Sequence, residues 1–342
     1  MHSAPPARRP APVALAWLLL AATASTGLGQ SQTSRPVQAA PESASPALSI
    51  RCSPALALHM RARAAAGRGE LGEPLPRLAA AVDEAAGAGR VWLALEPSLA
   101  GGDLQATAAR LASLPLDRLV AEKAEPTRAA LAAYLDSLAA ALPAFERDQW
   151  PALKAAQELR AERLGRALGG GDDPLLRRTL AALRLSGAGA ARIELTPEAP
   201  PPGAFTYRSP AGPVSIVGDN GLDDDTLLEV ALHEAIHAFD SMATGERTDA
   251  LAQMRAALLA AGLDERDPRF RAAWHALFFV HAAEMVRRDG RSGYVDYGER
   301  FGVYEKAGGA AGLMRDLWPR VLDREIELTE FAERVALAAR AG

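Results

Sequence analysis

The sequence holds one cysteine, few aromatic residues and no excess of positive charge. Of its 342 residues, Cys52 is the single cysteine and 5% are aromatic. One cysteine excludes an internal disulfide framework, so stability must come from a hydrophobic core and from any bound metal. The formal net charge is −4, and no basic stripe typical of nucleic-acid-binding proteins stands out. We therefore expect no nucleic-acid partner.

Apolar residues are abundant instead, at 49% of the chain. This is enough for a substantial core in one large domain or in two smaller ones. Alanine is frequent among these residues, and its intrinsic propensity favours helix. The composition therefore indicates a globular and largely helical protein.

The first fifty residues are typical of an export signal followed by a linker. A pair of arginines precedes a short apolar run, residues 11–22, and a small-x-small cleavage site closes it at residues 22–24. The run is too short to span a bilayer comfortably. We predict a signal peptide over 1–24 and a periplasmic or secreted protein with no stable membrane span after cleavage. Residues 25–50 are rich in Ser, Pro and Ala, which predicts a flexible linker.

The rest of the chain divides into a helical part and a mixed part. Over residues 51–185 apolar residues recur at helical spacing, which predicts a helical region. Within it, residues 90–97 have the composition of a short strand. After residue 186, β-like segments bounded by Pro and Gly predict a small sheet, and helical segments follow. The predicted strands are 191–197, 203–209 and 212–218, and the predicted helices are 226–243, 268–288 and 320–340. The fold class is therefore α+β and predominantly helical.

The predicted helix 226–243 contains a motif with a known chemistry. His233 and His237 are four residues apart, so on a helix their imidazoles lie on one face and can point at one ion. Glu234 follows the first histidine directly and lies beside that ion. This HExxH pattern is typical of zinc proteases, in which the two histidines bind Zn²⁺ and the glutamate is the general base. The third histidine of the metzincin pattern is missing, because position 243 is alanine.

The third zinc ligand has several candidates on the predicted helix 268–288. Glu284 lies in a largely apolar segment, where a buried carboxylate needs a partner such as a metal. We favour Glu284 over His275 and His281. The alternative without a metal is a salt bridge from Glu284 to Arg287 or Arg288.

The order of these segments resembles the gluzincin class of zinc metallopeptidases. More narrowly, it is similar to a group of exported bacterial proteins with a thermolysin-like core. The resemblance covers about residues 190–340 and rests on VALHEAIHAFD, WHALFFVHAAEMVRR and YVDYGERFGVYE. It implies that His233, His237 and Glu284 hold the zinc ion, with Glu234 as the catalytic base.

The resemblance also implies a zincin-like pair of active-site helices within a catalytic region, 186–342. Enzymes of this class often use a tyrosine to stabilise the developing oxyanion, and Tyr297 or Tyr304 is the expected residue. The expected function is an exported zinc metallopeptidase that acts on a peptide or protein substrate. The alternative is a non-catalytic zinc-binding protein in which the helices of 51–185 form a binding module.

Overall fold

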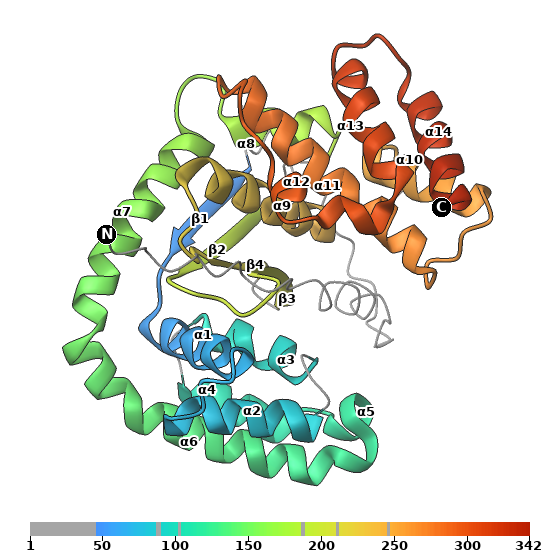
Figure 1. Cartoon of the computed structure of the whole chain (residues 1–342). Helices are drawn as coiled ribbons and strands as arrows, with labels where there is room; N and C mark the ends of the chain where they lie inside the picture. The colour runs from blue at the N-terminus through green and yellow to red at the C-terminus, as the bar shows by residue number, and fades with distance from the viewer. Residues whose placement is uncertain (1–45, 87–89, 102–103, 186–188, 210–211, 245–246) are drawn as a thin grey trace, which may run out of the picture.

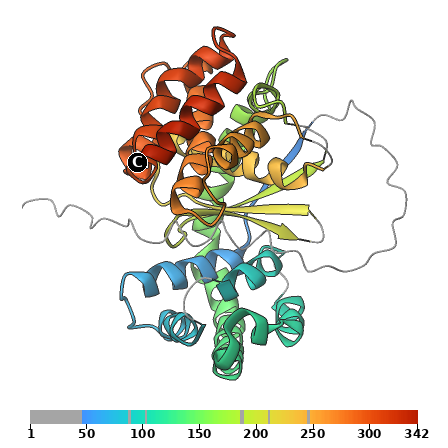
Figure 2. The same cartoon turned by 90° about the vertical axis from the view of Figure 1, so that its right-hand side faces the viewer.

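The computed structural model describes residues 46–342 except 87–89, 102–103, 186–188, 210–211 and 245–246. The predicted signal peptide and most of the predicted linker lie outside the described residues. The fold class is α+β and mostly helical, as expected. A small mixed sheet lies between a lower and an upper layer of helices (Figures 1 and 2).

The sheet has four strands, in the order β1-β2-β4-β3. Strands β1, β2 and β4 are parallel, and β3 is antiparallel to β4 at one edge. Their bounds are β1 (Ala47–Arg51), β2 (Ala190–Thr196), β3 (Ala204–Ser209) and β4 (Gly212–Gly218). The last three confirm the predicted strands. Strand β1 lies instead at the end of the predicted linker. It was not predicted, because it covers only five residues and its parallel partner lies far along the chain.

The lower layer covers one face of the sheet. It consists of α1 (Pro54–Gly67), α2 (Pro74–Ala86), α3 (Arg90–Leu99), α4 (Leu104–Ser113), α5 (Leu116–Val120), η1 (Ala121–Lys123) and α6 (Ala124–Asp148). The segment 90–97, for which we considered a strand, is helical. Its buried side chains Val91, Leu95 and Leu99 recur every fourth residue, which is the spacing of one helix face.

Helix α6 is long and apolar enough to cross a membrane by length and composition alone. The core helix of a globular protein passes the same test. In this structure α6 packs against α1, α2, α4 and α5, and its buried side chains contribute to the lower core.

Helix α7 (Trp150–Gly169) connects the two layers by running past the β1 edge of the sheet (Figure 1). Helix α8 (Leu175–Ala182) follows it. Both helices belong to the predicted helical region 51–185, and their side chains Leu164, Leu168 and Leu176 pack in the same core as the upper layer.

The upper layer covers the other face of the sheet. It consists of α9 (Asp224–Met242), α10 (Ala250–Ala260), α11 (Pro268–Arg288), α12 (Tyr297–Arg300), η2 (Val303–Ala307), α13 (Gly309–Leu322) and α14 (Leu328–Ala341). Helices α9 and α11 confirm two predicted helices. The predicted helix 320–340 is confirmed from Leu328 onward as α14, but it begins later than expected, because the chain turns between α13 and α14, where Arg324 has a φ of 62°. Helix α10 and most of α13 have no counterpart among the predicted helices.

The local sequence explains where helix α9 begins. The side chain of Asp223 caps its first turn by accepting a hydrogen bond from the backbone N–H of Thr226 at 2.8 Å. Asp224 and Asp225 follow, where negative charge suits the helix N-terminus. The helix then packs across β2, β3 and β4 on one side and against α11 on the other.

A buried polar network joins the lower layer to the edge strand β3. The carboxylate of Glu96 accepts hydrogen bonds from Arg63 and from the hydroxyl of Tyr207. Its Oε1 lies 3.2 Å from Nε2 of His59, whose Nδ1 lies 2.8 Å from the hydroxyl of Tyr134. Glu96 is completely buried, so its charge depends on these partners.

Arg63→Ala should lower the free energy of unfolding by about 3–5 kcal/mol, because it leaves the buried carboxylate of Glu96 without its cation. Arg68→Ala is the control, because Arg68 is half exposed and pairs with the exposed Glu70. It should cost less than about 1 kcal/mol. Urea denaturation of both variants measures the difference. Equal losses would contradict a stabilising role for the buried pair.

Candidate metal centre

Three histidine side chains meet where α9 packs against α11. His233 and His237 come from adjacent turns of α9, and His275 comes from the first half of α11. The Nε2 atoms of His233 and His237 are 3.2 Å apart. The Nε2 atom of His275 lies 3.1 Å from that of His233 and 3.0 Å from that of His237. The three ring nitrogens therefore form a tight triangle.

This triangle fits a single metal ion. Zinc–nitrogen bonds of about 2.1 Å in tetrahedral geometry place ligand nitrogens roughly 3.4 Å apart, close to the observed spacing. A neutral imidazole carries one N–H and one acceptor nitrogen. Three Nε2 atoms that converge on one another cannot all be satisfied by mutual hydrogen bonds, whereas one cation can accept a lone pair from each. Imidazole suits zinc and also copper, iron and nickel, so the ligands alone do not fix the metal.

Burial keeps the three imidazoles in the form that binds metals. It lowers the pKa of His233 and His237 well below the usual value, and repulsion from His275 lowers both further. Burial also lowers the pKa of His275 to about 4, with a smaller contribution from the positive charge of Lys306. At neutral pH all three rings are therefore uncharged, as metal ligation requires.

Two aromatic rings of α11 hold the histidine rings in place. Phe278 stacks on His237 with ring centroids 4.1 Å apart and planes at 17°. Phe279 lies 3.9 Å from the ring of His233. Both phenylalanines lie one turn after His275 on the same face of α11, so one helix supplies a ligand and the packing around the other two.

Glu234 is buried beside the histidines, with 3% of its surface exposed. The hydroxyl of Thr206 on β3 donates a hydrogen bond to its Oε2 at 2.5 Å and also lies 2.8 Å from the hydroxyl of Ser215. Burial raises the pKa of Glu234 to about 7, although the Thr206 hydrogen bond opposes this rise. A carboxyl group with this pKa can both accept and donate a proton near neutral pH.

The structure does not bring the predicted third ligand, Glu284, to the cluster. Glu284 and His275 are nine residues apart, which turns them to opposite sides of α11, roughly 180° apart. Glu284 instead accepts hydrogen bonds from Arg288 at 2.7 Å and from Arg287 at 3.3 Å. This is the arrangement without a metal that the sequence left open, and His275, the less favoured candidate, occupies the third position.

His281, the other candidate, has a separate structural role. Its Nδ1 accepts a hydrogen bond from the indole N–H of Trp318 at 3.0 Å, so its proton lies on Nε2. That Nε2 donates to the backbone carbonyl of Thr179 at 3.0 Å. Both ring nitrogens are thereby used, and burial lowers the pKa of His281 to about 4.

Tyr297 is connected to the cluster through ring contacts. Its ring stacks on Phe279 at 5.9 Å and 12°, and Phe279 packs on His233. Burial raises the pKa of Tyr297 to about 12, and the negative charges of Glu229 and Glu234 contribute. Tyr297 is thus connected to His233 through the ring of Phe279.

Tyr304, the second predicted oxyanion donor, lies in a different set of contacts. Its ring packs against Gly298, where a Cβ atom would collide with it, and beneath the guanidinium of Arg315 at 5.4 Å. Burial and the negative charge of Asp296 raise its pKa above the usual range. Tyr304 therefore packs the segment after α11, and none of these contacts reaches the histidine cluster.

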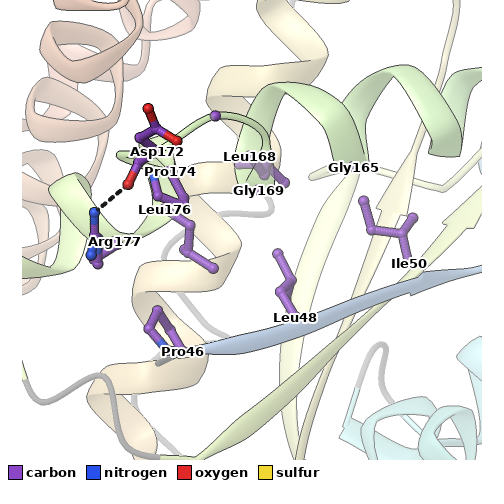
Figure 3. A pocket seen from close by; sticks show the side chains of 11 residues that line it. Pro46, Leu48, Ile50, Gly165, Leu168, Gly169, Asp172, Pro174, Leu176 and Arg177 are labelled. Atoms are coloured by element: carbon purple, nitrogen blue, oxygen red, sulfur yellow. Dashed lines mark hydrogen bonds between the residues drawn. The ribbon is translucent and has the colours of Figure 1, made fainter. Parts of the chain in front are cut away.

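A cavity of about 310 Å³ lies at the β1 edge of the sheet, apart from the histidine cluster (Figure 3). Leu48 and Ile50 of β1 line it on one side, and the end of α7, the start of α8 and the residues between them line it on the other. The side chain of Arg177 donates to the backbone carbonyl of Asp172 at 2.8 Å within its wall. None of the three histidines lines this cavity.

The sequence indicates the two helices that carry the site, α9 and α11, but not the partner of Glu234 or the third histidine. Nothing in the sequence marked Thr206 as a partner of Glu234, because this contact joins a strand to a helix that follows it. A usable signal existed for the third ligand. His275, Phe278 and Phe279 have the i, i+3, i+4 spacing of one helix face, which groups the aromatic pair with a histidine rather than with Glu284.

Comparisons of the chain with protein-family models, with curated proteins and with solved structures found no match. The comparisons therefore identify no family, and the gluzincin resemblance rests on the motifs alone. The structure shows a mixed α+β protein with a buried cluster of three histidines that could hold a metal ion.

His275→Ala should remove most of the zinc retained after loading and dialysis, whereas Glu284→Ala should retain about one ion per chain, as a three-histidine site requires. Elemental analysis of both variants and of the wild type measures this, with circular dichroism to confirm folding. The opposite result, with zinc lost from the Glu284 variant alone, would restore Glu284 as the ligand.

His281 should lower the stability of the metal-free protein as the pH drops from about 6.5 towards 4. In this window the unfolded chain protonates His281, whereas the folded chain keeps it neutral, so the unfolded state binds more protons. The His281 contribution should amount to about 1.4 kcal/mol per pH unit. Urea denaturation in the presence of a chelator, at several pH values, should show a shallower pH dependence for His281→Gln. An unchanged slope would mean that His281 does not resist protonation.

Proposed function

We propose that this chain is an exported zinc-dependent metallopeptidase in which His233, His237 and His275 hold the zinc ion and Glu234 is the general base. The observation that carries the proposal is the convergence of three Nε2 atoms within 3.2 Å beside a buried carboxyl group. Export is supported by the N-terminal sequence alone.

The chemistry of the proposed reaction divides between the metal and the chain. A zinc ion with three protein ligands acidifies water and polarises a carbonyl group. Glu234 is placed to take the proton from the attacking water and to pass it to the leaving amine. Thr206 orients its carboxylate by a hydrogen bond from β3. Tyr297, whose ring packs on Phe279 beside His233, is the better candidate of the two tyrosines to donate to the developing oxyanion.

The edge strand β3 supports a peptide as the substrate. Among the strands that the structure describes, β3 pairs with β4 on one side and has no strand on its other side. An extended peptide can add to such an edge through main-chain hydrogen bonds. Because Thr206 of β3 contacts Glu234, a peptide on this edge would pass the proposed base.

A non-catalytic zinc protein is the second candidate function. The depth of the site favours it, because His233 is 2% exposed and Glu234 is 3% exposed. A deeply buried ion with a closed coordination shell would be structural. His237 and His275 are only partly buried as residues, which favours access from solvent instead.

Glu234→Gln should retain zinc and lower peptide turnover at least about 100-fold, because the amide cannot act as a base. Cleavage of a peptide library by the zinc-loaded protein, followed by mass spectrometry, measures turnover, and elemental analysis measures zinc in the same samples. Glu330→Gln, at an exposed position on α14, is the control and should behave as the wild type.

Wild-type turnover in the Glu234 variant would contradict the role of Glu234. Zinc binding without cleavage of any peptide by the wild type would favour the non-catalytic alternative. A wild type that retains no zinc would overturn both functions.

A further inference from the structure

Glu229 is a buried acid that the proposed reaction does not use. It is completely buried and lies one turn before His233, on the same face of α9. Its Oε2 accepts a hydrogen bond from the hydroxyl of Tyr294 at 2.6 Å and from the backbone N–H of Tyr297 at 2.8 Å. Its Oε1 is buried and has no hydrogen-bond partner among the described residues.

His233 has a complementary free atom. Its Nε2 points to the other two histidines, and its buried Nδ1 has no hydrogen-bond partner in the described part of the chain. When Nε2 binds a metal, the proton of the neutral ring lies on Nδ1. A buried N–H without an acceptor is costly, and histidine ligands almost always donate this proton to a carboxylate, a carbonyl or a water molecule.

We propose that Glu229 is a positioning residue for the metal ligand His233: its Oε1 accepts the Nδ1–H of His233 through one bridging water molecule. This inference rests on the metal site of the proposed function. The other acids around the site already have donors. Glu234 has Thr206, and Glu284 has two arginines. Glu229 lies one turn from His233, and its buried Oε1 has no hydrogen-bond partner among the described residues.

The same carboxylate couples the metal to Tyr297. Glu229 holds the backbone of Tyr297 through Oε2, and the ring of Tyr297 returns to His233 through Phe279. With the proposed hydrogen bond, His233 would be linked to Glu229, Glu229 to Tyr297, and Tyr297 through Phe279 back to His233. Orientation of His233 by the metal therefore also fixes the start of α12, which carries the proposed oxyanion donor.

Glu229→Gln should weaken zinc binding about 10- to 100-fold, the range found when such an outer partner of a ligand is lost. Competition of zinc between the protein and a chromophoric chelator measures the affinity. The visible spectrum of the cobalt-loaded protein reports a change in ligand geometry that a purely structural role would not produce. Glu194→Gln is the matched control. Glu194 is equally buried and also has a free carboxylate oxygen among the described residues, but it lies on β2 and forms an ion pair with Arg192.

Hydrogen exchange at the amide of Tyr297 tests the coupling. In the wild type, zinc should slow this exchange, whereas in the Glu229→Gln variant the rate should no longer depend on zinc. If that variant does not fold, Tyr294→Phe replaces it, because it removes one donor to Glu229 and leaves the carboxylate in place. It should weaken zinc binding in the same direction by a smaller factor.

The outcomes separate this inference from the proposed function. If the wild type binds zinc and both Glu229→Gln and Tyr294→Phe bind it equally tightly with an unchanged cobalt spectrum, the role of Glu229 is overturned and the metal site stands. If the wild type binds no zinc, the metal site fails and the inference fails with it. Weaker binding in Glu229→Gln but not in Glu194→Gln supports the proposal.

Discussion

The packing of α9 against α11 is the constraint on which the site depends. Two of the three histidines are fixed by the helical repeat of α9, but the third arrives from another helix at 3.0 Å from His237. That distance tolerates little movement, because a shift of about 1 Å would take one nitrogen out of bonding range of a shared ion. Phe278 and Phe279 of α11 pack against the rings of His237 and His233, which fixes the position of α11 relative to α9. The sheet supports α9 from its other side, so both helices are held in place.

Burial at this packing interface also sets the charges of the site. It disfavours every charged form there, which keeps the imidazoles neutral and raises the pKa of Glu229 to about 8 and that of Glu234 to about 7. A divalent cation among these groups would be compatible with neutral imidazoles and would favour ionised carboxylates. The same desolvation that makes isolated charge costly therefore prepares the site for one cation. Glu284 is not one of these groups, since its charge is already compensated by Arg287 and Arg288.

The sequence predicted the parts of the fold that are encoded locally. Strands β2 to β4 are short β-like segments bounded by Pro or Gly, and α9 and α11 begin at the caps Asp223 and Asp267, so the positions of these elements could be predicted. The orientation of α11 about its own axis could not be predicted. This helix is buried on several sides, so its apolar pattern does not mark the face that meets α9. The choice between His275 and Glu284 was a choice between opposite sides of that helix. Strand β1 was missed for a related reason, since its partner lies far along the chain and only tertiary pairing stabilises it.

Adjacent residues of β3 connect the lower layer to the proposed chemistry. Side chains alternate across a strand, so Thr206 reaches Glu234 of α9 while its neighbour Tyr207 reaches Glu96 of α3 on the opposite face. An edge strand has a hydrogen-bonded neighbour on one side only, and its position depends on what packs above and below it. The ion-paired Glu96 anchors β3 from below, and the strand in turn carries the hydroxyl that orients Glu234. The lower helices therefore need no contact with a substrate to affect the site, because they hold the strand on which the proposed base depends.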